Sequence, residues 1–139
     1  MSLEHEGAQN LKQSEKETCA DRITEAIISR GEDFTRFMNA RDEETQEEFY
    51  NYGLSIDMVS MGTFKDQNEP YLRYQISYGG PSEELRFYQN GTVEFWFLDW
   101  FDGAHKIIKA PWVDWLKEHL KDWELLTNER FFKAWEYQE

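Results

Sequence analysis

Apolar and polar residues alternate along four runs in the middle of this chain. The runs lie at about 54–64, 71–79, 83–89 and 93–100. In the second run, for example, Leu72, Tyr74 and Ile76 alternate with polar side chains. Such alternation is typical of β-strands that bury one face. Because short turn-forming segments join the runs, we predict an antiparallel meander of four strands.

The dipeptide Asn90-Gly91 marks the hairpin between the last two runs. Asn-Gly is a preferred pair for a two-residue type I′ loop. Such a loop places Leu85 opposite Trp96 and Tyr88 opposite Val93. One face then carries Leu85, Phe87, Trp96 and Leu98, and the other carries Tyr88, Val93, Phe95 and Phe97. Since both faces are apolar, we expect this hairpin in the centre of the sheet with cover on each side.

Helical periodicity flanks the predicted sheet. We expect helices at about 14–30, 32–52, 111–123 and 128–137. Ser14 and Glu17 have the spacing of a capping box. Gly31 occupies a position that commonly ends a helix, and Pro111 suits the first turn of another.

Two segments allow more than one interpretation. The acidic stretch 41–48 is either a solvated helix face or a break between two shorter helices, and 105–109 is either a short fifth strand or an extended connection. With the helices segregated from the strands, the chain belongs to the α+β class. We expect one domain at 14–139 behind a flexible tail at 1–13.

Charge limits the partners that this chain can have. Its 139 residues include 28 Asp and Glu against 15 Lys and Arg, for a formal net charge of −13. A basic surface for nucleic acid or for an anionic membrane is therefore not expected. The charge favours a basic protein partner or serves solubility alone.

The remaining composition indicates a soluble protein of the cytoplasm. A single cysteine, Cys19, excludes an internal disulfide framework and fits a buried structural thiol in a reducing compartment. No apolar run is long enough to span a membrane. Nucleotide-binding, metalloprotease and serine-hydrolase motifs are absent from the sequence, and we expect no cofactor.

Acidic and aromatic residues supply the candidate binding surface. We select as binding residues Asp42, Glu43, Glu44, Glu47, Glu48 and Trp100. If one face of the sheet is uncovered, its aromatic side chains also offer a surface for a homodimer.

A second candidate site follows the last strand. Asp99, Asp102 and His105 lie close together in sequence, and two carboxylates with an imidazole suit a divalent metal or acid–base chemistry. Asp-Gly is also ordinary turn chemistry, which is the interpretation we favour. Within the sheet, we expect Arg73 and Arg86 to pair with nearby glutamates (Glu83, Glu84 and Glu94).

The hairpin sequence also resembles a known pattern. The runs GGPSEELRFY and GTVEFWFLDWFDGA, at 79–88 and 91–104, are similar to a motif of small uncharacterised proteins associated with bacteria, plasmids and phages. The resemblance covers the hairpin alone and brings no catalytic residues with it. It implies an accessory role linked to a mobile element.

These observations together favour a non-enzymatic protein that binds a basic, nucleic-acid-handling protein. It would act as an inhibitor of the immunity type or as a mimic of DNA. The alternative is a small metal-dependent hydrolase that uses Asp99, Asp102 and His105.

Overall fold

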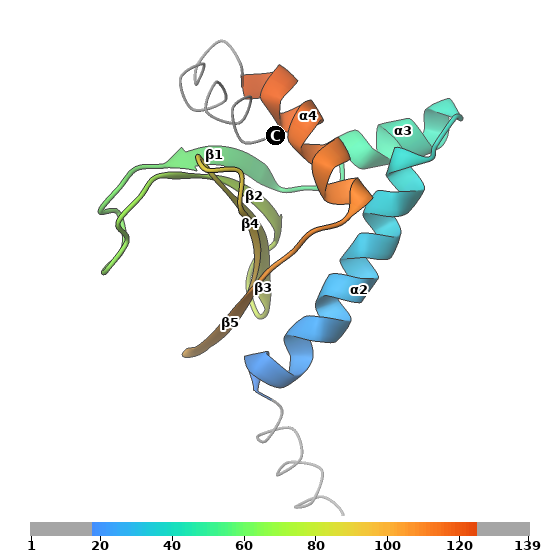
Figure 1. The fold of residues 1–139 in the computed structure, drawn as a ribbon. Coiled ribbons are helices and arrows are strands. Elements are labelled where there is room, and N and C mark those ends of the chain that lie inside the picture. Colours follow the sequence, from blue (N-terminus) through green and yellow to red (C-terminus); the bar gives the residue numbers. More distant parts are fainter. Residues whose placement is uncertain (1–17, 125–139) are drawn as a thin grey trace, which may run out of the picture.

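The computed structural model describes residues 18–124, which form helices and one sheet (Figure 1). In chain order the elements are α2 (Cys19–Met38), α3 (Glu43–Tyr50), β1 (Ser55–Val59), β2 (Tyr71–Ser77), β3 (Ser82–Tyr88), β4 (Val93–Asp99), β5 (Asp102–Ile107) and α4 (Pro111–Glu124). The strands pair in the order β1-β2-β3-β4-β5, and every pairing is antiparallel. The α+β class and the meander are confirmed. None of the helices in residues 18–124 combines the length and the hydrophobicity that crossing a bilayer requires.

The prediction of four strands is wrong, because a fifth strand extends the meander. β5 starts at Asp102, earlier than the 105–109 segment that sequence left open. Gly103 lies within β5 and pairs with Leu98 of β4. A Cβ at Gly103 would lie 2.7 Å from the side chain of Leu98, so glycine allows the close approach of the two strands.

Helix α2 runs through Gly31, contrary to the predicted end there. A Cβ at this position would lie 3.1 Å from the indole nitrogen of Trp112 in α4. The glycine therefore provides room for a neighbouring helix, at a moderate cost in helix propensity. The helices instead separate at residues 39–42, where Asp42 caps the start of α3. The acidic stretch is thus a break followed by a short helix.

The predicted helices agree with the structure to different degrees. α4 matches the predicted helix at 111–123 closely. Thr18 and Asp21 form a capping box at the start of α2, in place of the expected one at Ser14. Ser14 itself, the tail at 1–13 and the predicted helix at 128–137 lie outside the described residues.

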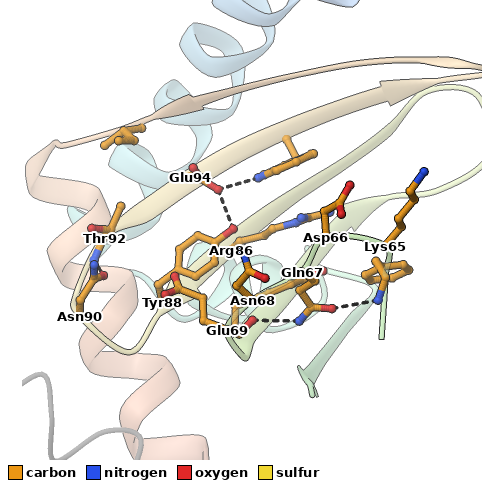
Figure 2. A pocket seen from close by; sticks show the side chains of 14 residues that line it. Lys65, Asp66, Gln67, Asn68, Glu69, Arg86, Tyr88, Asn90, Thr92 and Glu94 are labelled. Carbon is orange, nitrogen blue, oxygen red and sulfur yellow. Dashed lines mark hydrogen bonds between the residues drawn. The ribbon is translucent and has the colours of Figure 1, made fainter. Parts of the chain in front are cut away.

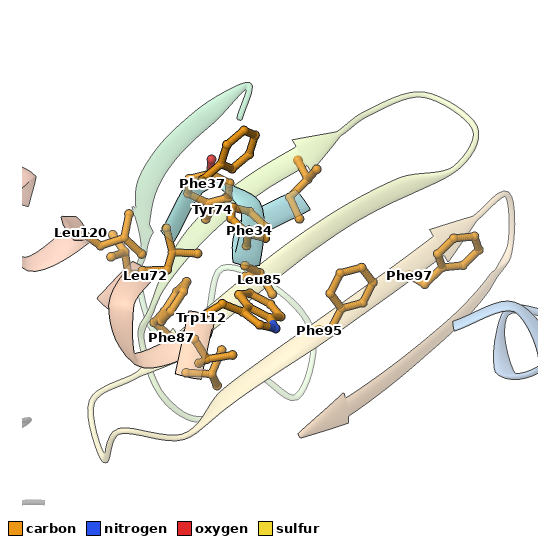
Figure 3. Close-up of a cluster of buried hydrophobic side chains, with 14 of the residues drawn as sticks. Phe34, Phe37, Leu72, Tyr74, Leu85, Phe87, Phe95, Phe97, Trp112 and Leu120 are labelled. Atoms are coloured by element: carbon orange, nitrogen blue, oxygen red, sulfur yellow. The ribbon is translucent and has the colours of Figure 1, made fainter. Parts of the chain in front are cut away.

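All three described helices lie on one side of the curved sheet, and the hollow of the curve faces away from them (Figure 1). The core fills the space between the sheet and the helices (Figure 3). Phe34 of α2 stacks on Trp112 of α4 with the ring centroids 5.0 Å apart. Leu85, Phe87 and Phe95 from the central strands are wholly buried beside them.

The central hairpin has a register one residue away from the predicted one. Leu85 pairs with Phe95, where a two-residue loop would have placed Trp96. Tyr88 N–H donates to Thr92 O at 2.9 Å, Gly91 N–H donates to Tyr88 O at 2.9 Å, and Gly91 has a φ of 91°. This is a three-residue loop that ends in a left-handed glycine. Its position in the middle of the sheet is as predicted.

A shift of one residue moves one strand's side chains to opposite faces. The predicted pair of apolar faces is therefore wrong. The helix-covered face carries Leu85, Phe87, Val93, Phe95 and Phe97, whereas the face without helices, here called the open face, carries Glu84, Arg86, Tyr88, Glu94 and Trp96. Apart from Glu83 and Asp99, which pair with arginines of α2, the charged residues of this hairpin thus gather on the open face. A homodimer across this face stays a prediction.

Candidate interaction surface

The turn between β4 and β5 exposes two large aromatic residues. Asp99 pairs with Asp102, so Trp100 and Phe101 are the two central residues of a tight hairpin turn. Trp100 is 90% exposed and Phe101 is fully exposed. Trp100 has a φ of 56°, in a position of the turn that usually holds glycine. We call residues 99–102 the aromatic turn.

Two carboxylates attach the aromatic turn to the start of α2. Asp99 accepts a hydrogen bond from Arg22 at 2.5 Å, and Asp102 accepts one from the backbone N–H of Cys19 at 2.7 Å. The bond from Cys19 lowers the pKa of Asp102, while burial raises the pKa of the Cys19 thiol. A non-glycine residue with positive φ costs about 1–2 kcal/mol. These contacts therefore help to hold Trp100 in a strained, exposed position.

An acidic groove of about 600 Å³ lies beside the turn, between α2 and the sheet. Arg22 and Arg30 line it, but Arg22 pairs with Asp99 and Arg30 with Glu83. The exposed carboxylates of Asp21 and Glu25 are in no ion pair with the described residues. The groove therefore presents negative charge next to two exposed aromatic rings.

Internal ion pairs use most of the arginines in residues 18–124. The pairs are Arg22–Asp99, Arg30–Glu83, Arg36–Glu48, Arg73–Asp57 and Arg86–Glu84. Arg86 pairs with a glutamate, as expected. Arg73 also pairs with a carboxylate, but its partner is an aspartate, Asp57. Because these cations are neutralised internally, the excess of carboxylates is left for the surface.

The predicted acidic residues are at the far end of α2 from Trp100. The side chains of Glu43, Glu44 and Glu47 are exposed and form no ion pair or hydrogen bond within the described part of the chain. Asp42 accepts a hydrogen bond from the N–H of Thr45, and hydrogen bonds from Thr45 lower the pKa of Asp42. Since α2 has 20 residues, it separates α3 from the aromatic turn by about 30 Å.

Glu48, the remaining member of the predicted acidic set, pairs with Arg36 through both carboxylate oxygens at 3.1 and 2.7 Å. The hydrogen bonds from Arg36 lower the pKa of Glu48. Glu48 therefore connects α3 to α2, and within the predicted acidic set only the side chains of Glu43, Glu44 and Glu47 have neither an ion pair nor a hydrogen bond among the described residues.

The three residues of the alternative metal site do not converge. Asp99 and Asp102 are bonded to α2, as described above. His105 pairs with Trp96 on the open face and stacks on its ring at a centroid distance of 4.3 Å. Among residues 18–124, no three His, Cys, Asp or Glu side chains are grouped so that they could hold a metal ion.

Comparison with known proteins found no match to this chain, whether among protein-family models, curated proteins or solved structures. The resemblance of the hairpin to small plasmid- and phage-associated proteins therefore stays a prediction, and the site has to be interpreted from its geometry.

Sequence reasoning missed the arrangement on the open face. Tyr71, Arg86, Trp96 and His105, one from each of β2 to β5, form a continuous stack. The Arg86 guanidinium lies 4.6 Å from the Tyr71 ring centroid and 3.6 Å from that of Trp96, whose ring stacks in turn with His105. The sequence did contain a signal for this arrangement. A three-residue loop at 89–91 sets the register that places Arg86 and Glu94 on the same face.

Proposed function

We propose that this chain is a non-enzymatic binding protein for a basic, nucleic-acid-handling protein. Its partner would contact the aromatic turn and the acidic groove. The observation that carries the proposal is Trp100, which is strained, almost fully exposed and attached to α2 through both neighbouring aspartates. Tryptophan is a frequent energetic centre of protein interfaces.

Charge supports a basic partner. The chain has a net charge of −13, and Asp21 and Glu25, beside the turn, are in no ion pair with the described residues. The carboxylates of α3 lie too far from Trp100 to share one small contact. They would act over distance, by steering a basic protein towards the surface at a salt-dependent rate. An inhibitor of the immunity type and a DNA mimic both fit this description.

The test is retention of basic nuclease and DNA-binding proteins on the immobilised chain at low and high salt. We expect retention at low salt and release at high salt. The Trp100→Gly variant should lose most of the retention while its melting temperature stays equal or rises, because glycine relieves the positive φ. Met61→Ala, which removes a side chain that is 66% exposed in the β1–β2 connection, is the matched control.

Three outcomes would contradict the proposal. They are the absence of any retained basic protein at low salt, retention that is insensitive to salt, and equal retention by Trp100→Gly and wild type. Competition separates the two forms: a DNA mimic should be displaced from its partner by duplex DNA, whereas an inhibitor bound outside the DNA groove should not.

A further inference from the structure

The hollow of the open face contains a cavity of about 670 Å³ (Figure 2). Its floor is formed by strands β2 to β5, and the β1–β2 connection at 64–69 makes one wall. Four aromatic residues line it, namely Phe64, Tyr71, Tyr88 and Trp96. This volume lies in the range of small-ligand sites, which are typically aromatic cavities with a few fixed polar groups.

Glu94 provides a fixed carboxylate in this cavity. Its Oε1 accepts hydrogen bonds from the Tyr88 hydroxyl at 2.6 Å and from the Trp96 indole N–H at 2.9 Å (Figure 2). Neither donor is a cation, and Glu94 forms no ion pair with any described lysine or arginine. Its Oε2 has no hydrogen-bond partner within residues 18–124. The carboxylate is therefore oriented but not neutralised.

Tyr71 gives an independent indication of a missing partner. The residue is wholly buried and lines the cavity, yet its hydroxyl has no hydrogen-bond partner in the described structure. A buried polar atom without a partner costs about 1–3 kcal/mol. A ligand with an N–H group would supply the missing bond to the hydroxyl oxygen.

The charges of the cavity favour a cation. Arg86 lies in the floor, but its Nε donates to the buried carboxylate of Glu84 at 2.7 Å, so this pair is close to neutral as a unit. The remaining charged residues of the lining are Lys65, Asp66, Glu69 and Glu94. Carboxylates thus exceed cations among these residues, so this part of the lining attracts positive charge.

We propose that this cavity binds an organic cation, an alkylguanidinium or alkylammonium group. The cation pairs with Oε2 of Glu94, and one of its N–H groups bonds to the hydroxyl of Tyr71. Its alkyl chain lies against the aromatic walls. The group comes either from a small polyamine or from an arginine or lysine side chain. This site is separate from the aromatic turn and does not depend on it.

The test is an NMR titration of the full chain with n-butylguanidinium, followed through the indole N–H signal of Trp96. We expect a saturable shift with this probe and little response to n-butylurea, which has nearly the same shape without the charge. Glu94→Gln should weaken binding about tenfold, the usual effect of losing one charged hydrogen bond. Tyr71→Phe should also weaken it. Glu118→Gln, with the same charge change at an exposed position of α4, should leave binding unchanged.

Thermal melting of each variant shows whether it is folded. Equal responses to n-butylguanidinium and n-butylurea, or unaltered affinity in a folded Glu94→Gln, would overturn the proposal. Spermidine and the peptide N-acetyl-Gly-Arg-Gly-amide separate the two sources, since stronger binding of either one supports that source of the cation. Trp100→Gly should bind n-butylguanidinium as tightly as the wild type. Failure of the cation site and failure of the partner surface are therefore distinguishable.

Discussion

Phe95 and Trp96 are neighbours on β4, but they belong to different environments. Phe95 is wholly buried against the helices among leucine and phenylalanine side chains. Trp96 is on the open face, stacked between Arg86 and His105 and bonded to Glu94. One face of the sheet packs against an apolar core, with ion pairs to α2 at its edge, and the other is a layer of rings and charges.

The two faces gain stability in different ways. On the covered face, burial of apolar area is non-directional and depends on filling volume. On the open face each charged group needs a specific partner, as Arg86 has in Glu84 and Arg73 in Asp57. The register of one hairpin therefore decides which residues form the core and which are available for binding.

The largest expected effect is on the covered face. Phe95→Ala should lower the free energy of unfolding by about 3–5 kcal/mol, because it leaves a cavity in a close-packed core. Ile107→Ala is the control from the open side of β5, where the side chain is 62% exposed, and should change stability by less than about 0.5 kcal/mol. Urea unfolding of both variants measures this. Similar losses would contradict the separation of the faces.

Removal of the Arg86 side chain should have the next largest effect. In Arg86→Met the buried Glu84 loses its cation, so we expect a loss of about 3 kcal/mol. The double variant Glu84→Gln with Arg86→Met should recover more than half of that loss, as a double-mutant cycle would show. If the single variant behaved like a broken surface ion pair, the open face would contribute little to stability.

Substitutions in the hairpin loop test its length. Gly91→Ala should cost about 1–2 kcal/mol, because Gly91 has a φ of 91°. Asn90→Gly distinguishes the two loops, since a type I′ turn needs positive φ at both central residues and would gain from glycine. In this structure Asn90 has no positive φ, so the same change should be destabilising by up to about 1 kcal/mol. A stabilised Asn90→Gly variant would favour the two-residue loop.

The smallest expected effect concerns Tyr88, whose hydroxyl donates to Glu94. Tyr88→Phe should cost about 1 kcal/mol at neutral pH. Burial, and then the bond to Glu94, raise the pKa of Tyr88 above the ordinary value of 10.0. The folded state therefore keeps this proton when the unfolded chain has lost it, and stability falls as pH rises past 10. Urea unfolding at pH 8 and pH 11 should show a smaller decline in the variant. Equal declines would contradict this assignment.

Much of the fold could be predicted from local pattern. Alternation located β1 to β4, and periodicity located α4, because both signals lie within short segments. The continuation of α2 through Gly31 could not be predicted in this way. Its reason is the contact with Trp112, a residue far along the chain. Gly103 is similar, since only its pairing with Leu98 shows why glycine is there.

The candidate site was harder to predict than the fold. Trp100 was among the predicted binding residues, but the prediction grouped it with acidic residues at the opposite end of α2. The stack that includes Arg86 was missed because Asn90-Gly91 suits loops of two lengths. Only the three-residue loop separates Arg86 and Glu94 from the apolar side chains. Requiring these two charged side chains to share one face would therefore have selected the correct register.

The most direct test of the two-faced sheet is the cross-strand NOE pattern of the central hairpin in solution. Backbone NOEs should pair Leu85 with Phe95 and Phe87 with Val93, as in the register described above. That result would place Arg86, Trp96 and Glu94 together on the open face. NOEs that pair Leu85 with Trp96 would contradict the account, because the charged residues of the two strands would then lie on different faces.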